Sequence, residues 1–319
     1  MIETRDGRAS MAYFGAKPWH GLGQVLSAED ARSVELTIAA ANLDWNVEKV
    51  PVQTSDDQKL IENLFAIRRE HDKRVYTIAT ERYNILQNRQ SFDWFQPFLD
   101  TNAVTFETAG SLFDGAVIFI LAKMAGAFKI AEGDEVEQYL LLQHSHNGKH
   151  CIDASDTPVR VVCNNTLSLA NNSKSKKVWG KIKHSKTMLT RLENVRDQIA
   201  ESKFRFAEYM ELYKQLTRVQ AKPAQVQDYY KTIMGKKDVA YIDLPKQSKD
   251  RLDKLEYYFS NGKGNTNPAI AGTWWAAYNG YTEFLSHDSG RSLENRYADL
   301  WFNGADNQLA LDTALAMVS

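Results

Sequence analysis

The spacing of apolar residues changes near Lys186, and this change limits the chain to folds that combine a sheet with helices. Before it, stretches such as 46–53, 64–70 and 74–80 combine partial alternation with β-branched and aromatic residues, which is typical of strands. After it, apolar residues from Leu189 to Leu216 recur at steps of three and four, or multiples of them, which indicates a helix. The sequence therefore predicts an α+β fold, a mostly antiparallel sheet with flanking helices followed by a helical C-terminal extension.

The same change divides the chain into two expected parts. Residues 1–185 should form an α+β sheet domain with a basic surface, and residues 186–319 a helical region with one long helix and several aromatic-rich ones. The long helix should run until Pro223 stops it. At 1.5 Å per residue it would be about 50 Å long.

Turn residues between the alternating stretches indicate antiparallel hairpins. His71-Asp72-Lys73 and Phe113-Asp114-Gly115 each separate two strand-like runs, and Asn147-Gly148 is a strong signal for a two-residue turn. A turn at Asn147-Gly148 would pair Ser145 with His150 and His144 with Cys151.

Composition is that of an ordinary globular protein. Hydrophobic residues make up 43% of the 319 residues and charged residues 25%. No secretory signal and no apolar run long enough to span a bilayer is evident, so we expect a cytoplasmic protein without a membrane partner. The two cysteines, Cys151 and Cys163, lack metal or redox spacing, and both are expected to be small buried apolar residues. Nothing in the pattern predicts a cofactor.

Charge is strongly segregated, although the formal net charge is only -1. Between Asp156 and Glu193 lie 36 residues without an acidic side chain. The cations of this stretch are Arg160, Lys174, Lys176, Lys177, Lys181, Lys183, Lys186 and Arg191. Such a region can attract a polyanion.

Trp179 lies within the lysine run and suggests which polyanion. Lysines can follow the phosphates of a single strand while an aromatic ring stacks on a base, so the run predicts a single-stranded nucleic-acid surface. Arg68, Arg69 and Arg74, at the first hairpin, could extend it. The alternative is a solvated loop whose lysines only keep an exposed connection soluble, with Trp179 folded back as an anchor.

Uncommon words in the sequence resemble the phage/plasmid-like protein family of unknown function. In chain order they are KPWHGLG, YNILQN, ETAGSLFDGAVIFILA, YLLLQHSHNG, TPVRVVCNNTLSLA, GTWWAAYNGYTEFLSH and LWFNGA. The resemblance covers nearly the whole chain. It implies a mobile-element protein in the cytoplasm of a bacterial host, and it carries no catalytic residues.

The expected order of strands and helices is also similar to the core of the single-strand-annealing recombination mediators. That resemblance implies an oligomeric ring whose basic groove holds single-stranded DNA by its backbone. The resulting hypothesis is a homo-oligomer that binds single-stranded DNA without catalysis during phage or plasmid recombination or replication, with strand annealing as a further step. The long helical C-terminal half is not part of that core.

Three histidines in the word HSHNGKH offer an enzymatic alternative. His144 and His146 point to one side of a strand, as metal ligands would, whereas His150 falls on the opposite face. At most His144, His146 and Cys151 could converge. The expectation is therefore that no metal is bound, with a metal-dependent enzyme acting on nucleic acid as the alternative.

A third hypothesis is a structural or host-interaction protein. Its working surface would be the aromatic helix that contains Trp274, Trp275, Tyr278, Tyr281 and Phe284. Packing in a core is the default interpretation of such residues, and burial between subunits is the alternative.

Overall fold

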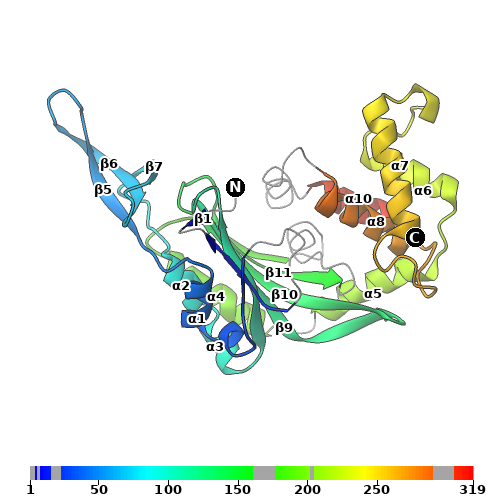
Figure 1. Cartoon of the computed structure of the whole chain (residues 1–319), viewed down its shortest axis with the longest axis horizontal. Coiled ribbons are helices and arrows are strands. Elements are labelled where there is room, and N and C mark those ends of the chain that lie inside the picture. The colour runs from blue at the N-terminus through cyan, green and yellow to red at the C-terminus, as the bar shows by residue number, and fades with distance from the viewer. Residues whose placement is uncertain are drawn as a thin grey trace. The chain divides into compact units, whose positions relative to one another are not determined.

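A computed structural model describes residues 4–5, 8–15, 23–160, 177–201, 205–289 and 305–318 of the chain (Figure 1). The chain folds into two units. The sheet unit lies within Met1–Ala125, Tyr139–Asp156 and Val178–Ser202, and the helical unit lies within Gly126–Gln138, Thr157–Lys177 and Lys203–Ser319. Helices and a mostly antiparallel sheet together confirm the predicted α+β class, with helices at the C-terminus.

The largest sheet has seven strands. They are β3 (Met11–Tyr13), β4 (Gln24–Val25), β8 (Val104–Leu112), β9 (Val117–Ala131), β10 (Asp134–Ser145), β11 (Ile152–Arg160) and β12 (Lys177–Ile182). Their order is β12-β11-β10-β9-β8-β3-β4, so β12 is an edge strand. β8 pairs antiparallel with β9 and with β3, whereas β3 and β4 are parallel. Two short strands, β1 (Thr4–Arg5) and β2 (Arg8–Ala9), form a separate ribbon.

The hairpin between β8 and β9 turns where the sequence predicts it. Leu112 pairs with Val117, and Phe113, Asp114 and Gly115 between them all have positive φ angles, of 54°, 56° and 84°. Glycine adopts that conformation without steric cost, and aspartate tolerates it better than most residues.

Helices cover one face of the sheet. They are the 3-10 turn η1 (Asp30–Arg32), α1 (Val34–Ala40), α2 (Asn88–Asp93), α3 (Gln96–Asp100) and α4 (Met188–Glu201). Ile38 and Leu192 on the helices share a buried apolar core with Ile120 and Leu142 on the strands. At the end of α2, Trp94 Nε1 donates a hydrogen bond to the Leu192 carbonyl at 2.8 Å, which fixes α2 against α4.

A second, three-stranded sheet belongs to the sheet unit. β5 (Val47–Gln53), β6 (Leu60–Arg69) and β7 (Val75–Thr80) are antiparallel in the order β5-β6-β7, which confirms the hairpin across His71-Asp72-Lys73. The outer part of β5 and β6 extends as an arm (Figure 1). Leu60 and Ile61 on this arm are 67% and 39% exposed.

The helical unit contains α5 (Arg205–Arg218), α6 (Pro223–Ile233), the 3-10 turn η3 (Tyr241–Asp243), α7 (Lys246–Asn261), α8 (Trp274–His287) and α10 (Ala305–Ala316). The tips of β9 and β10 contribute Ile130 and Val136 to its core. Trp275 Nε1 on α8 donates to Asp134 Oδ2 on β10 at 2.6 Å, and both side chains are buried.

The aromatic residues of α8 form a core. They are Trp274, Trp275, Tyr278, Tyr281 and Phe284, each at most 5% exposed. The structure therefore supports packing in a core, which is the default interpretation of these aromatic residues. A surface made by these side chains, whether for a host partner or for another subunit, is not present, because they are already buried within the chain.

The compact units do not follow a single boundary at residue 185. α4 packs on the sheet, and α5 belongs to the other unit, although both lie in the stretch predicted as one long helix. Residues 202–204, between them, are outside the described residues. In the part of the chain that is described, no helix is long and apolar enough to cross a membrane.

Candidate functional site

Four exposed cations lie within eleven residues that run from the end of β12, through the connecting loop, into the first turn of α4. We call residues 181–191 the basic segment. Lys181 and Lys183 flank Ile182, which is 1% exposed and lies in the core beneath the helices. Because side chains alternate along a strand, both lysines point away from that core and into solvent.

Lys186 and Arg191 continue the basic segment into α4. Both are exposed, and the segment contains no acidic residue. Among the described residues, no acidic side chain pairs with any of its four cations. Within the described structure, their charges are therefore not neutralised by the chain itself.

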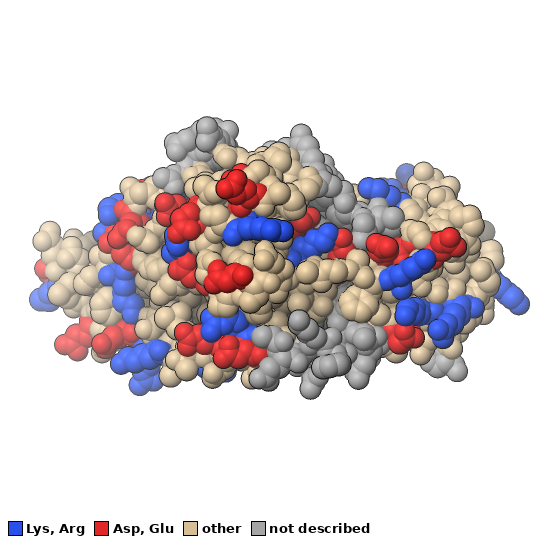
Figure 2. Space-filling view, turned by 90° about the horizontal axis from the view of Figure 1, so that it is seen from below, with Lys and Arg blue, Asp and Glu red and all other residues tan. Residues whose placement is uncertain are grey.

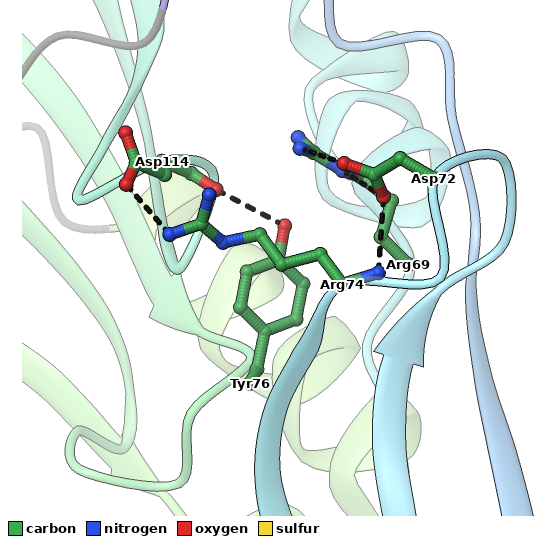
Figure 3. A network of polar contacts seen from close by, with 5 residues as sticks. All are labelled: Arg69, Asp72, Arg74, Tyr76 and Asp114. Carbon is green, nitrogen blue, oxygen red and sulfur yellow. Dashed lines mark hydrogen bonds and ion pairs between the residues drawn. The ribbon is translucent and has the colours of Figure 1, made fainter.

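The arginines of the first hairpin are paired with acidic residues of the chain instead, and Figure 3 shows this for Arg69 and Arg74. Arg68 Nε lies 2.8 Å from Glu48 Oε1, and Arg74 Nη2 lies 2.6 Å from Asp114 Oδ2. Tyr76 Oη donates to the Asp114 carbonyl at 3.3 Å, so this network joins β7 to the β8–β9 turn. These arginines neutralise acids of the chain itself.

Arg69 is not part of any exposed basic surface. Its side chain is 4% exposed, its Nη2 lies 2.6 Å from Asp72 Oδ2, and its guanidinium lies 5.0 Å from the Trp45 ring centroid. The hydrogen bond from Arg69 lowers the pKa of Asp72 to about 2. Alternation along β6 places Arg69 on the buried face, and a buried arginine must be paired.

Several predicted site residues cannot be placed. Lys174 and Lys176 lie outside the described residues, and so does Cys163, which was expected to be a buried apolar residue. Arg160, Lys177 and Trp179 are described only as backbone positions in β11 and β12. The stacking role of Trp179 thus remains a prediction. Figure 2 shows one face of the molecule on which acidic and basic side chains are interspersed.

His144 and His146 share one face of β10, as the sequence predicts, but they are buried. Their ring centroids are 5.0 Å apart, and their exposed fractions are 1% and 0%. His146 Nε2 lies 2.9 Å from Asn88 Oδ1. Because the Asn88 amide group donates to the carbonyls of Leu43 and Trp45, its oxygen must accept, and His146 is protonated at Nε2.

His144 has the same tautomer. Its Nε2 lies 2.8 Å from Ser91 Oγ, whose hydroxyl donates to the Gln87 carbonyl. A third imidazole, His184, lies 6.4 Å from His144 between ring centroids and donates from Nδ1 to the Asn84 carbonyl. The second nitrogen of each ring, Nδ1 of His144 and His146 and Nε2 of His184, is buried without a hydrogen-bond partner in the described structure.

Burial keeps these imidazoles neutral. Desolvation is the main cause that lowers the pKa of His146 to about 3 and the pKa of His144 well below 6.5, and the neighbouring histidines lower both further. Desolvation also lowers the pKa of His184.

The alternative metal set of His144, His146 and Cys151 does not assemble. Within the described residues, no three His, Cys, Asp or Glu side chains are arranged to hold a metal ion. The predicted two-residue turn is wrong, because β10 ends at Ser145 and β11 begins only at Ile152. Ser145 contacts His150 through its hydroxyl, which donates to the His150 carbonyl and accepts from the His150 N–H, each at 3.0 Å. His184 was missed because only the folded chain brings it beside residues forty positions earlier.

The fold and the basic segment define an α+β protein with an exposed cationic sheet edge and a buried cluster of neutral histidines. The chain belongs to the family described as Domain of unknown function (DUF932), whose model matches residues 75–301. No curated protein and no solved structure matches the chain. The match includes β7, most of the seven-stranded sheet and the basic segment.

Proposed function

We propose that this protein binds single-stranded DNA without catalysis, through contacts between the basic segment and the phosphate backbone. The observation that carries the proposal is the contrast between two sets of cations. Those of the basic segment are exposed and free of acidic partners among the described residues, whereas Arg68, Arg69 and Arg74 are paired within the chain. Backbone binding requires cations that are not already neutralised.

The resemblance to a phage/plasmid-like family supports the setting that we propose, which is recombination or replication of a mobile element in a bacterial cytoplasm. We further propose that the protein acts as a homo-oligomer, since the strand-annealing mediators that it resembles form rings. Annealing of two strands would be a further step beyond binding.

The competing explanation is that Lys181 and Lys183 protect an edge strand. Charged side chains, lysine above all, prevent exposed strand edges from pairing with other chains. In that case removing them would cause aggregation and leave nucleic-acid binding unchanged.

Fluorescence anisotropy with labelled single- and double-stranded oligonucleotides of equal length tests the proposal. The variant Lys181→Ala/Lys183→Ala should bind single strands more weakly and with a shallower salt dependence. A matched control is Lys59→Ala/Lys73→Ala, which removes the same charge from lysines that are paired with Asp57 and Glu48. Equal binding by both variants and the parent protein would contradict the proposal.

A further inference from the structure

The turn between β7 and α2, residues Glu81–Asn84, lies against the basic segment although about a hundred residues separate them. Asn84 N donates to the His184 carbonyl at 3.1 Å, and His184 Nδ1 lies 3.1 Å from the Asn84 carbonyl, to which it donates. The Tyr83 and His184 rings stack with centroids 4.8 Å apart and planes 19° apart. Three contacts thus join the turn to the segment.

Every backbone carbonyl of this turn has a donor. Lys49 Nζ donates to the Glu81 carbonyl at 2.9 Å and to the Tyr83 carbonyl at 2.6 Å. Asn84 Nδ2 donates to the Arg82 carbonyl at 3.0 Å, and His184 satisfies Asn84. A turn held in this way loses little conformational entropy when it binds a ligand.

The aromatic ring in the turn is not available for stacking on a base. Tyr83 is only partly exposed, its hydroxyl donates to the Ser145 carbonyl at 3.1 Å, and one face of its ring is against His184. Its role is to hold the turn in place.

Arg82 is the cation that this rigid turn presents. Its side chain is exposed, and within the described structure no acidic side chain pairs with it. The side chains of Lys49 and Asn84 are used to hold the turn, and Glu81 is the acidic neighbour.

We infer that Arg82 is a phosphate-binding residue of the same surface as Lys181, Lys183 and Lys186, so that two segments distant in sequence hold one phosphodiester chain. This inference rests on the proposed function. It also bears on the ligand, because cations that contact phosphates read the backbone and carry no base information. Single strands of DNA and RNA should therefore bind alike, with little dependence on sequence.

The test compares Arg82→Ala with Arg74→Ala by anisotropy titration across a fourfold range of salt. Arg74 is an exposed arginine of the same unit whose charge is neutralised by Asp114. Losing one phosphate contact should reduce the magnitude of the slope of log K against log salt by about 0.7 for a single strand. Over that fourfold range, the affinity of Arg82→Ala should then fall about 2.6-fold less than that of the parent protein.

Two further variants separate charge from structure. Arg82→Lys keeps the charge and should keep the parent slope, whereas Glu81→Gln removes the acidic neighbour and should strengthen binding. Urea unfolding should give the same midpoint for Arg82→Ala as for the parent, because the exposed side chain supports no other described residue.

The outcomes distinguish this inference from the proposed function. If the parent protein binds neither DNA nor RNA oligonucleotides, both are wrong. If Lys181→Ala/Lys183→Ala weakens binding while Arg82→Ala behaves like Arg74→Ala, the proposed function stands and Arg82 is not a ligand. A marked preference of the parent for one base sequence would overturn backbone recognition.

Discussion

Trp275 on α8 donates a hydrogen bond from Nε1 to Asp134 on β10 over 2.6 Å, and both side chains are buried. The contact joins the hairpin tip to the aromatic core of the helical unit. Hydrogen bonds to charged groups contribute about 1.5–3 kcal/mol to stability. We expect Trp275→Phe to lower the free energy of unfolding by about that much more than Trp274→Phe does. Urea titration of the two variants measures the difference, and equal losses would show that the bond contributes nothing.

Gly115 should resist substitution more than another glycine with positive φ. A Cβ there would lie 2.6 Å from Tyr76 Oη and 2.9 Å from Arg69 Nη1, at a φ of 84°. Gly126, with a φ of 100°, has open space around the same position. Gly126→Ala should cost about 1 kcal/mol of backbone strain, and Gly115→Ala about 1–3 kcal/mol more from overpacking. Thermal unfolding of both variants measures the two losses of stability. A larger loss for Gly126→Ala than for Gly115→Ala would contradict the prediction.

The buried histidines should make the protein sensitive to acid. The pKa of His146 is lowered to about 3 in the folded chain, against an ordinary value of 6.5. Between these pH values the unfolded chain binds a proton that the folded chain does not. Stability is therefore greatest above pH 6.5 and falls as pH decreases, by up to about 1.4 kcal/mol per pH unit for each such histidine.

For the variant His146→Gln, the free energy of unfolding should depend less steeply on pH between pH 6 and 4.5 than it does for the parent protein. Urea unfolding at several pH values measures this slope. His150 is the comparison, because it is only partly buried, so burial lowers its pKa without excluding it from solvent. If His150→Gln flattens the curve as much as His146→Gln, the buried cluster is not the cause.

Charge and stacking should separate in the salt dependence of binding. If three or four lysines of the run each neutralise a phosphate, log K should fall against log salt with a slope of about -2 to -3. Lys181→Ala/Lys183→Ala should reduce the magnitude of this slope by about one unit or slightly more. Trp179→Ala should leave the slope nearly unchanged while costing about 1–3 kcal/mol, which is typical for one lost base-stacking contact. A parent-like affinity for Trp179→Ala would assign it to packing.

Multi-angle light scattering should find a homo-oligomer at working concentration. The α8 aromatic residues are buried within the chain, so the subunit contacts must use other surfaces. A monomer mass with and without oligonucleotide would rule out the ring that we propose.

The sequence predicts the fold class well because its signals are local. The period of apolar residues and the residues of the Phe113-Asp114-Gly115 turn depend on neighbours along the chain, and the structure confirms both. The shared face of His144 and His146 follows equally from strand alternation.

The features that the sequence does not predict depend on tertiary contacts between residues far apart in the chain. Alternation along β6 separates Arg69 from its neighbour Arg68, but the partners that make its burial possible, Asp72 and the Trp45 ring, are known only from the folded chain. The hydrogen bonds between Asn84 and His184 bring the turn that contains Arg82 against the basic segment, and no local sequence pattern predicts them. For the same reason α4, predicted as part of a C-terminal extension, packs under the sheet.

The interleaving of the two units along the chain has a consequence for how the protein can be divided. The β9–β10 tip supplies core residues to the helical unit, and α4 supplies core residues to the sheet unit. A single cleavage after residue 185 would leave each fragment with an incomplete interior. Fragments 1–185 and 186–319 should therefore remain unfolded when they are made separately. They should recover structure only when they are mixed, because each supplies core residues that the other lacks.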